Sequence, residues 1–236
     1  MKNIALLILT FLSLNAYAAK PKHSFVKLTT SKGECIIMLY NQTPKHRDNF
    51  IKLVKEDFYN GTLFHRVIKE FMIQGGDPDS KTAKPEQALG EGDLGYTVDA
   101  EFRDSLFHKK GVLAAARDDH PQKASSACQF YLVQGKKWTD AELDKLEQGR
   151  LQGRKINPAH REVYKTIGGT PHLDQSYTVY GEVVKGIEII DSIANMPTAK
   201  ANRPVEDVKM EITLLKKREA KKIEKTLSSQ FLSFEL

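Results

Sequence analysis

Cysteine is scarce in this chain of 236 residues, which contains only Cys35 and Cys128. The two lie far apart in strand-like apolar sequence, and neither has the spacing of a metal-ligand motif, so the sequence predicts no metal site. An exported protein could hold a disulfide, but the sequence does not show whether the two Cβ atoms face each other. A disulfide and two buried free thiols are therefore both open alternatives.

The sequence also has no apolar run of the roughly 20 residues that a membrane-spanning helix needs. The most apolar run covers residues 4–14; Lys2 precedes it, and the small-x-small sequence Ala-Tyr-Ala follows at 16–18. This is the pattern of a secretory signal peptide, so we expect residues 1–18 to be removed. The mature chain would start at Ala19 as a soluble periplasmic or secreted protein without stable membrane insertion. An uncleaved membrane anchor is the alternative.

Charge of one sign is not concentrated in any long uninterrupted run. The chain has 36 lysines and arginines against 30 aspartates and glutamates, and its main basic concentration lies in a charged C-terminal tail over 216–236. Glu219 and Glu224 interrupt the basic residues and no aromatic residue interleaves them, which favours a solvated helical face over a nucleic-acid or membrane surface. We therefore expect no nucleic-acid partner.

Short β-prone segments, in contrast, are abundant. They cover 24–28, 34–40, 63–73, 111–116, 129–133, 177–184 and 208–214, and helical patterns run from Thr43-Pro44 to Asn60-Gly61 and over 187–194. Threonine followed by proline is a good helix start, with the threonine as N-cap. Many short strands with two well-separated amphipathic helices predict a barrel with capped ends rather than a doubly wound sheet.

A highly charged segment over 136–169 interrupts this pattern. Thr139 and Glu142 form a capping-box pattern, and Asn157-Pro158 begins a second short helical stretch. The sequence therefore predicts a small helical insertion on the surface.

The most informative stretch is FHRVIKEFMIQGGD, residues 64–77. In an extended strand, alternation places Arg66 on the face opposite His65 and Val67, so its guanidinium can reach a surface groove. This stretch closely resembles the signature of the cyclophilin family. The similarity continues in the segments 111–116, 126–131 and 173–181.

The resemblance implies a mainly β fold, a closed eight-stranded antiparallel barrel capped by two helices, in one isomerase domain over 19–215 that carries the insertion 136–169. It also implies a peptidyl-prolyl cis/trans isomerase (rotamase) that assists the folding of exported proteins. The partners would be proline-containing peptides and exported proteins that are unfolded or folding. The enzyme would act as a monomer with no cofactor and no metal.

Position by position, the resemblance also implies residue roles. Arg66 matches the catalytic arginine. The substrate-binding positions are Phe71, Met72, Gln74, Ala116, Arg117, Gln129, Tyr131, His172, Leu173 and Tyr177. His172 stands where many members carry a tryptophan that contacts the inhibitor cyclosporin, so the resemblance leaves cyclosporin sensitivity undecided, while isomerase activity is expected to survive.

These residue types suit the rotation of an X-Pro bond. Resonance gives the C–N bond double-bond character, with a barrier of about 18–20 kcal/mol. In the twisted transition state the prolyl nitrogen regains a lone pair, which a fixed guanidinium stabilises more than it stabilises the planar ground state. An apolar pocket holds the proline ring while the preceding carbonyl swings. Neither a nucleophile nor a metal is needed for this chemistry.

Other functions remain as alternatives. The chain could be a proline-peptide binding module or holdase whose insertion recruits a partner, or, ranked third, a protein whose basic surface binds nucleic acid or anionic lipid. His65 and His108 lie far apart in the sequence and lack the spacing of a metal site, so we interpret both as structural histidines.

Overall fold

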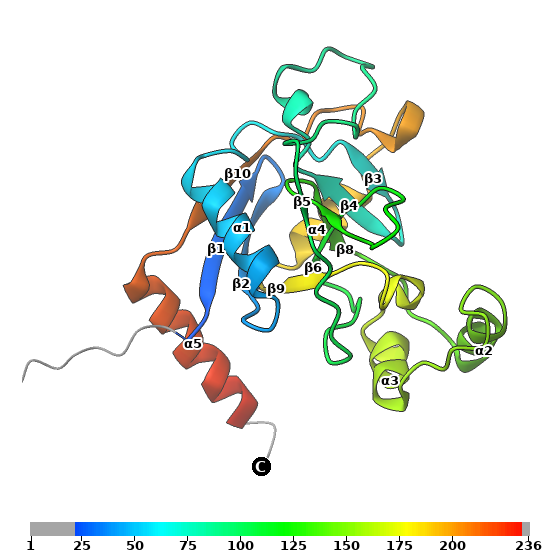
Figure 1. Cartoon of the computed structure of the whole chain (residues 1–236). Coiled ribbons are helices and arrows are strands. Elements are labelled where there is room, and N and C mark those ends of the chain that lie inside the picture. The colour runs from blue at the N-terminus through cyan, green and yellow to red at the C-terminus, as the bar shows by residue number, and fades with distance from the viewer. Residues whose placement is uncertain (1–21, 233–236) are drawn as a thin grey trace, which may run out of the picture.

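Figure 1 shows the computed structural model, which describes residues 22–232. One antiparallel sheet dominates it, with eight strands in the order β10, β1, β2, β9, β6, β8, β4, β3. The strands of this sheet are β1 (Ser24–Thr30), β2 (Gly33–Leu39), β3 (Arg66–Ile68), β4 (Met72–Gly75), β6 (Val112–Ala115), β8 (Phe130–Val133), β9 (Val179–Lys185) and β10 (Met210–Leu214). A separate two-stranded sheet pairs β5 (Thr97–Val98) with β7 (Ser125–Ser126).

The large sheet curls, and the described residues show no pairing between its edge strands β3 and β10. The segment before β3, and not β3 itself, meets the start of β10 and the residues before it: the Gly61 amide donates to the Met210 carbonyl, the Met210 amide donates to the Thr62 carbonyl, and the Phe64 amide donates to the Val208 carbonyl. The mainly β class and the eight antiparallel strands are confirmed, but the closed barrel is not supported. The reason is that β3 begins only at Arg66, beyond the point where the chain leaves β10.

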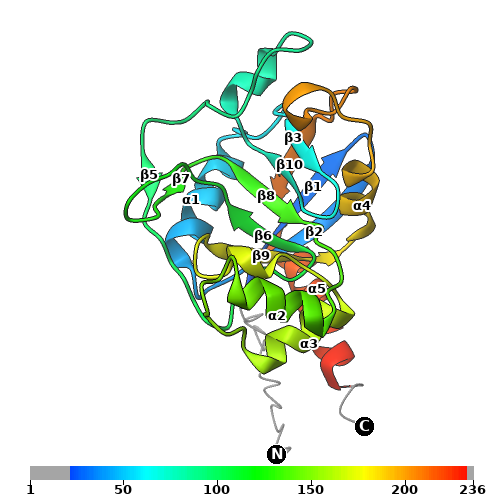
Figure 2. The ribbon, with the colours of Figure 1, turned by 90° about the vertical axis from the view of Figure 1, so that its right-hand side faces the viewer.

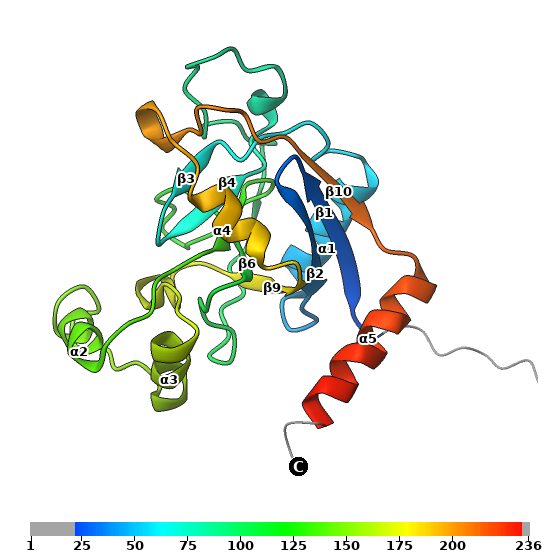
Figure 3. The ribbon, with the colours of Figure 1, turned by 180° about the vertical axis from the view of Figure 1, so that it is seen from behind.

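The core lies inside the curl of the sheet, under the helices α1 (Pro44–Lys55) and α4 (Glu188–Ala194). Helix α1 packs against β9 and β10, and α4 packs against β2, β3 and β4 (Figure 3). Phe50 of α1 and Ile190 of α4 belong to the same buried cluster as Cys35 and Cys128, which are free thiols. The two predicted capping helices are therefore confirmed, and of the two alternatives for the cysteines the buried thiols are found.

Helix α1 begins at Pro44 as predicted, but not by the predicted cap. The side chain of Thr43 makes no capping hydrogen bond, and its hydroxyl is buried without a partner among the described residues. The carboxylate of Glu101 replaces it, because its two oxygens accept the main-chain amides of Lys45 and His46 at 3.1 and 3.0 Å. A negative charge at a helix N-terminus is favourable for the same reason that a cap is, since both satisfy unpaired amides.

The predicted insertion forms two short helices, α2 (Asp140–Gln148) and α3 (Pro158–Thr166), which lie together beside the sheet (Figure 2). The capping box of Thr139 and Glu142 is present. The insertion also has a small core of its own. This core consists of Leu143, Leu151, Ile156 and Tyr164, packed against Phe107, Trp138 and Leu146.

The segment predicted as a charged tail forms a helix, α5 (Lys217–Leu232). Ala220 is buried against Phe25 and Ile36 on the outer surface of the sheet. Three short 3-10 helices complete the fold: η1 (Pro78–Thr82), η2 (Pro171–Leu173) and η3 (Lys200–Asn202). No helix within residues 22–232 is long and apolar enough to cross a membrane. The predicted signal peptide, residues 1–18, lies outside the described residues.

Candidate functional site

A row of polar side chains crosses β3, β4 and β8, which are neighbours in the large sheet. The strand register places Arg66 opposite Gln74, and Gln74 opposite Tyr131. The Arg66 guanidinium donates to Gln74 Oε1 at 3.1 Å, and Gln74 Nε2 donates to Gln129 Oε1 at 3.1 Å. Three of the predicted site residues, Arg66, Gln74 and Gln129, are thus joined in one chain of hydrogen bonds.

The far end of this chain is fixed by main-chain carbonyls. Gln129 Nε2 donates to the carbonyls of Gly90 and Gly92 at 2.8 and 2.9 Å. Because a carbonyl only accepts, the amide nitrogen of Gln129 must face the two glycines and its oxygen must face Gln74. For the same reason the oxygen of Gln74 must face Arg66, because a guanidinium only donates. The sequence did not indicate the two glycines, because their carbonyls come from an irregular loop.

Arg66 lies on the accessible face of its strand. His65 and Val67 are buried on the other face, whereas Arg66 is half-buried. Apart from Gln74, no described side chain or carbonyl accepts a hydrogen bond from its guanidinium. The prediction from strand alternation is confirmed, and the remaining N–H donors of Arg66 can reach a ligand.

An apolar cluster lies beside Arg66. Six of the predicted substrate-binding residues gather in it: Met72, Ala116, Tyr131 and Leu173 are buried, while Phe71 and Tyr177 are partly exposed. The Phe71 ring stacks on the ring of His172 with centroids 5.6 Å apart, and Tyr177 meets Tyr131 edge-on at 6.0 Å. Burial, together with the nearby charge of Arg150, lowers the pKa of His172 to about 4. His172 is therefore a neutral aromatic wall at pH 7.

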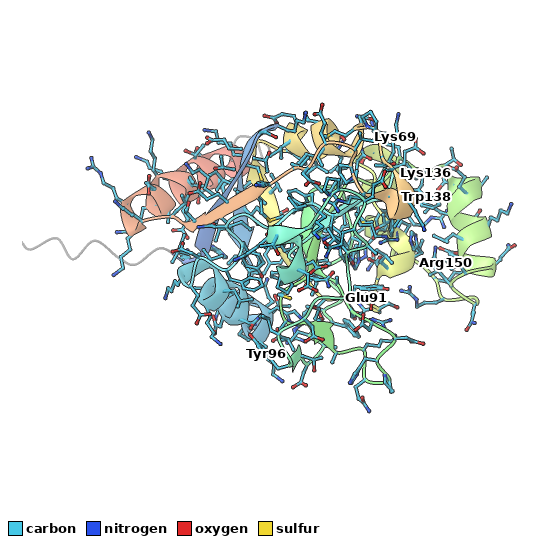
Figure 4. All side chains as sticks on the ribbon, turned by 90° about the horizontal axis from the view of Figure 1, so that it is seen from above. Lys69, Glu91, Tyr96, Lys136, Trp138 and Arg150 are labelled. Atoms are coloured by element: carbon cyan, nitrogen blue, oxygen red, sulfur yellow. The ribbon has the colours of Figure 1, made fainter. Side chains whose placement is uncertain are left out.

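A hollow of about 430 Å³ adjoins the polar chain on its other side. Its lining includes Gln74, Gln129, Ala116 and Arg117, together with the acidic residues Glu91, Asp93 and Asp118. In Figure 4, Glu91 and Tyr96 of this hollow lie apart from Arg150, which is on the side of the insertion. The predicted site residues thus fall into an apolar cluster and the lining of a polar hollow; Ala116 belongs to both, and Gln74 connects Arg66 to the hollow.

Two neighbouring residues among the predicted substrate-binding positions, Ala116 and Arg117, differ in the structure. The Ala116 amide donates to the Gln129 carbonyl, and the Ala116 carbonyl accepts from the Ser126 amide. Both main-chain groups of Ala116 therefore have partners within the protein. The Arg117 side chain is held in place, since its guanidinium donates to the Ser176 carbonyl at 2.9 Å and stacks over Tyr177 at 4.7 Å.

The described residues contain no group of three or more His, Cys, Asp or Glu side chains that could hold a metal ion. The site offers a guanidinium held by Gln74, an open hollow reached through Gln74 and Gln129, and an apolar cluster on the neighbouring strands. Such a site can bind an extended chain with an apolar ring in the pocket and can place a positive charge beside that ring. The roles of the individual residues stay predictions.

Known proteins resemble this chain over most of its length. The family described as "Cyclophilin type peptidyl-prolyl cis-trans isomerase/CLD" matches residues 25–214. A predicted peptidyl-prolyl cis-trans isomerase of Staphylococcus aureus is 34% identical over 187 residues, which cover 79% of this chain and 88% of that protein. A predicted bifunctional phosphatase/peptidyl-prolyl cis-trans isomerase of Streptococcus pyogenes is 36% identical over 189 residues, and the chain spans only 37% of its length.

Solved structures show the same fold. The crystal structure of a cyclophilin type peptidyl-prolyl cis-trans isomerase of Cryptosporidium parvum has a TM-score of 0.58 and 23% identity, and the match covers 82% of this chain and 98% of that one. With the family match over residues 25–214 and the relative from Staphylococcus aureus, the assignment rests on sequence as well as on fold. The chain belongs to the cyclophilin-type peptidyl-prolyl cis-trans isomerase family.

Proposed function

We propose that this isomerase acts on X-Pro bonds of exported proteins while they fold, and that Arg66 is its catalytic residue. The single observation that carries the proposal is the position of Arg66. Its guanidinium is oriented by Gln74, and the strand register places Gln74 opposite Tyr131, which belongs to the apolar cluster with Met72 and Leu173. A proline ring held in that pocket would have its nitrogen within reach of the guanidinium.

The guanidinium acts on the part of the reaction where charge develops. Rotation breaks the amide resonance and leaves a lone pair on the prolyl nitrogen, and a hydrogen bond from Arg66 to that lone pair is available only in the twisted state. Arginine suits this role because it stays charged and its donors are rigidly arrayed. Lowering the barrier by about 7 kcal/mol would accelerate the rotation roughly 10⁵-fold.

The pocket supplies the second requirement, which is a fixed proline ring. Phe71, Met72, Tyr131 and Leu173 hold the ring, while the residue before proline lies toward the hollow beside Gln129. The ring stays still and the preceding carbonyl swings, so binding energy is used to orient one side of the bond. A related crystal structure of the Cryptosporidium parvum isomerase was determined in the presence of the dipeptide Ala-Pro, which supports a proline peptide as the ligand class.

The cellular part of the proposal rests on the N-terminal sequence pattern. Residues 1–18 have the features of a signal peptide, so the substrates would be periplasmic or secreted proteins, and the mature enzyme would act as a monomer. Expression of the full chain in a Gram-negative host tests this directly. We expect a periplasmic product whose N-terminal residue is Ala19. A product that starts at Met1 and stays with the membrane fraction would contradict it.

The catalytic role is tested with purified residues 19–236 and a short X-Pro peptide whose cis and trans forms exchange slowly. Arg66→Ala should lose most of the acceleration while it still binds the peptide, because the pocket is intact. Arg218→Ala is the matched control, since Arg218 is an exposed arginine on α5 far along the chain from the site. An unchanged isomerisation rate in Arg66→Ala would contradict the catalytic role of Arg66.

A further inference from the structure

A buried chain of side chains connects the insertion to the pocket. The hydroxyl of Tyr164, on α3, donates to Asp174 Oδ2 at 2.7 Å. The other carboxylate oxygen, Oδ1, lies 2.9 Å from Nδ1 of His108, and Nε2 of His108 lies 3.0 Å from the hydroxyl of Tyr131. All four side chains are buried, and Tyr131 is a wall of the proline pocket.

The chemistry of these groups fixes the direction of each hydrogen bond. A carboxylate only accepts, so Nδ1 of His108 donates to Asp174, and Nε2 of a neutral imidazole then accepts from the Tyr131 hydroxyl. Burial raises the pKa of Tyr131 well above its usual value, so the hydroxyl keeps its proton and is able to donate. Asp174 Oδ1 also accepts the main-chain amide of His108 at 2.9 Å. Each side chain in this series therefore has one orientation that satisfies its hydrogen bonds.

The insertion is tied to this chain in a second place. The guanidinium of Arg154, from the turn between α2 and α3, donates to the main-chain carbonyl of Asp174 at 3.1 Å. Leu151 of the same turn is buried in the core of the insertion. The insertion therefore holds both the side chain and the main chain of Asp174, directly after the pocket residue Leu173.

We propose that Tyr164 is a positioning residue for the proline pocket: through Asp174 and His108 it fixes the hydroxyl of Tyr131 and thereby the plane of the ring that the proline contacts. This inference rests on the proposed function, since it assigns Tyr131 to the pocket. Without the Tyr164 hydroxyl, Oδ2 of Asp174 loses its partner in a buried site, and the carboxylate is held through Oδ1 alone. The contact of His108 with Tyr131 then loosens as well.

A double-mutant cycle tests the proposal. Tyr164→Phe removes only the hydroxyl at one end of the chain, and Tyr131→Phe removes only the hydroxyl at the other end. We expect Tyr164→Phe to lower kcat/KM for an X-Pro peptide about tenfold, which corresponds to about 1.4 kcal/mol. In the Tyr131→Phe background the same change should have less than about a twofold effect, because the link is already cut. Effects of the two changes that simply multiply would overturn the proposal.

A matched control separates positioning from stability. Asn157 caps α3 by accepting the Ala159 amide at 2.9 Å and does not touch the buried chain, so Asn157→Ala loosens the insertion from outside. We expect this variant to melt earlier than the wild type but to keep kcat/KM within about twofold. A fall in kcat/KM equal to that of Tyr164→Phe would mean that any weakening of the insertion acts alike, which contradicts a specific role for the hydroxyl.

A readout without catalysis keeps this inference separate from the proposed function. In protein labelled with 3-fluorotyrosine, the ¹⁹F signal that disappears in Tyr131→Phe belongs to Tyr131. That signal should shift in Tyr164→Phe and stay in place in Asn157→Ala. If it shifts while Arg66→Ala remains active, the proposed catalytic role fails and the positioning stands; if it stays in place while Arg66→Ala is inactive, only the positioning fails.

Discussion

Replacing Gln74 by leucine should slow the rotation step with little effect on the affinity for a proline peptide. The resemblance to cyclophilins predicts a peptide-binding role for this side chain. In the structure, however, its amide is used internally: Oε1 accepts from Arg66 and Nε2 donates to Gln129. Leucine has a similar shape and no polar atom, so the change removes the support of the guanidinium and leaves the apolar pocket intact.

The size of the effect follows from the lost contact. A hydrogen bond to a charged group contributes about 1.5–3 kcal/mol, which sets a ceiling of about 10- to 150-fold on kcat if all of it orients Arg66 in the twisted state. Arg66 is half-buried, so water replaces part of the lost bond. We therefore expect a fall in kcat of about tenfold, near the lower end of that range.

Exchange NMR on a short X-Pro peptide measures this directly, since it gives the rate at saturation and the dissociation constant of each isomer. Gln148→Leu, an exposed glutamine on α2, is the control for the loss of a polar side chain and should match the wild type. A Gln74→Leu variant with unchanged kcat and weaker peptide binding would refute the reasoning. It would show that Gln74 holds the peptide and that Arg66 needs no support.

Three further predictions concern stability. Burial lowers the pKa of His65 from 6.5 to about 4, so the folded protein binds fewer protons than the unfolded chain between these pH values. The free energy of unfolding, measured by chemical denaturation, should therefore fall by about 3 kcal/mol for this residue as the pH drops from about 6.5 to 4. His65→Phe should flatten that decline, and an equally steep decline in the variant would contradict the assignment. Thr43→Val should be neutral or slightly stabilising in thermal melts, because the hydroxyl is buried without a partner and caps nothing, whereas a loss of about 1 kcal/mol would show that Thr43 is the N-cap after all. Gly135→Ala should lower the free energy of unfolding by about 3 kcal/mol or more, because φ is 61° at this position and an added Cβ would overlap the main chain of Gly169. Gly135 and Gly169 lie where the chain enters and leaves the insertion. A folded variant with wild-type stability would show that these two segments can separate.

Local patterns in the sequence predicted much of this molecule, because they report on neighbours in the chain. Strand alternation placed Arg66 on the accessible face, opposite the buried His65 and Val67. The capping box of Thr139 and Glu142 and the start of α3 at Pro158 were also predictable, since both depend on residues three or fewer positions apart.

Contacts between distant segments were not predictable. The cap of α1 is the clearest case, because the carboxylate that replaces Thr43 belongs to Glu101, in a loop 56 residues beyond Lys45. The curl of the sheet without edge-to-edge pairing is another, since it depends on where β3 starts relative to β10 and not on either segment alone. Neither fact leaves a periodic signal in the sequence.

The same limit applied to the insertion, whose charge predicted a surface element and nothing more. Tyr164 gave no signal, because a tyrosine at a helical position is an ordinary core residue until its hydroxyl partner is known. Its partner Asp174 is only ten residues away, yet the remaining links, to His108 and Tyr131, span 66 and 23 residues. A charged surface element can therefore reach the pocket through one buried hydroxyl.

Two hydrogen-bonded chains hold opposite sides of the site. This arrangement explains how positioned side chains can accelerate a rotation that makes and breaks no covalent bond. One chain runs from Arg66 through Gln74 and Gln129 to main-chain carbonyls, and it fixes the charge. The other runs from Tyr131 to Tyr164, and it fixes a wall of the pocket. Rotation about an X-Pro bond forms and breaks no covalent bond, so an enzyme gains only by having its donors and walls in place before the bond twists. One chain ends on the main-chain carbonyls of Gly90 and Gly92, and the other ends on helix α3 of the insertion. Loosening either end should raise the barrier although no residue assigned to the proline pocket has changed.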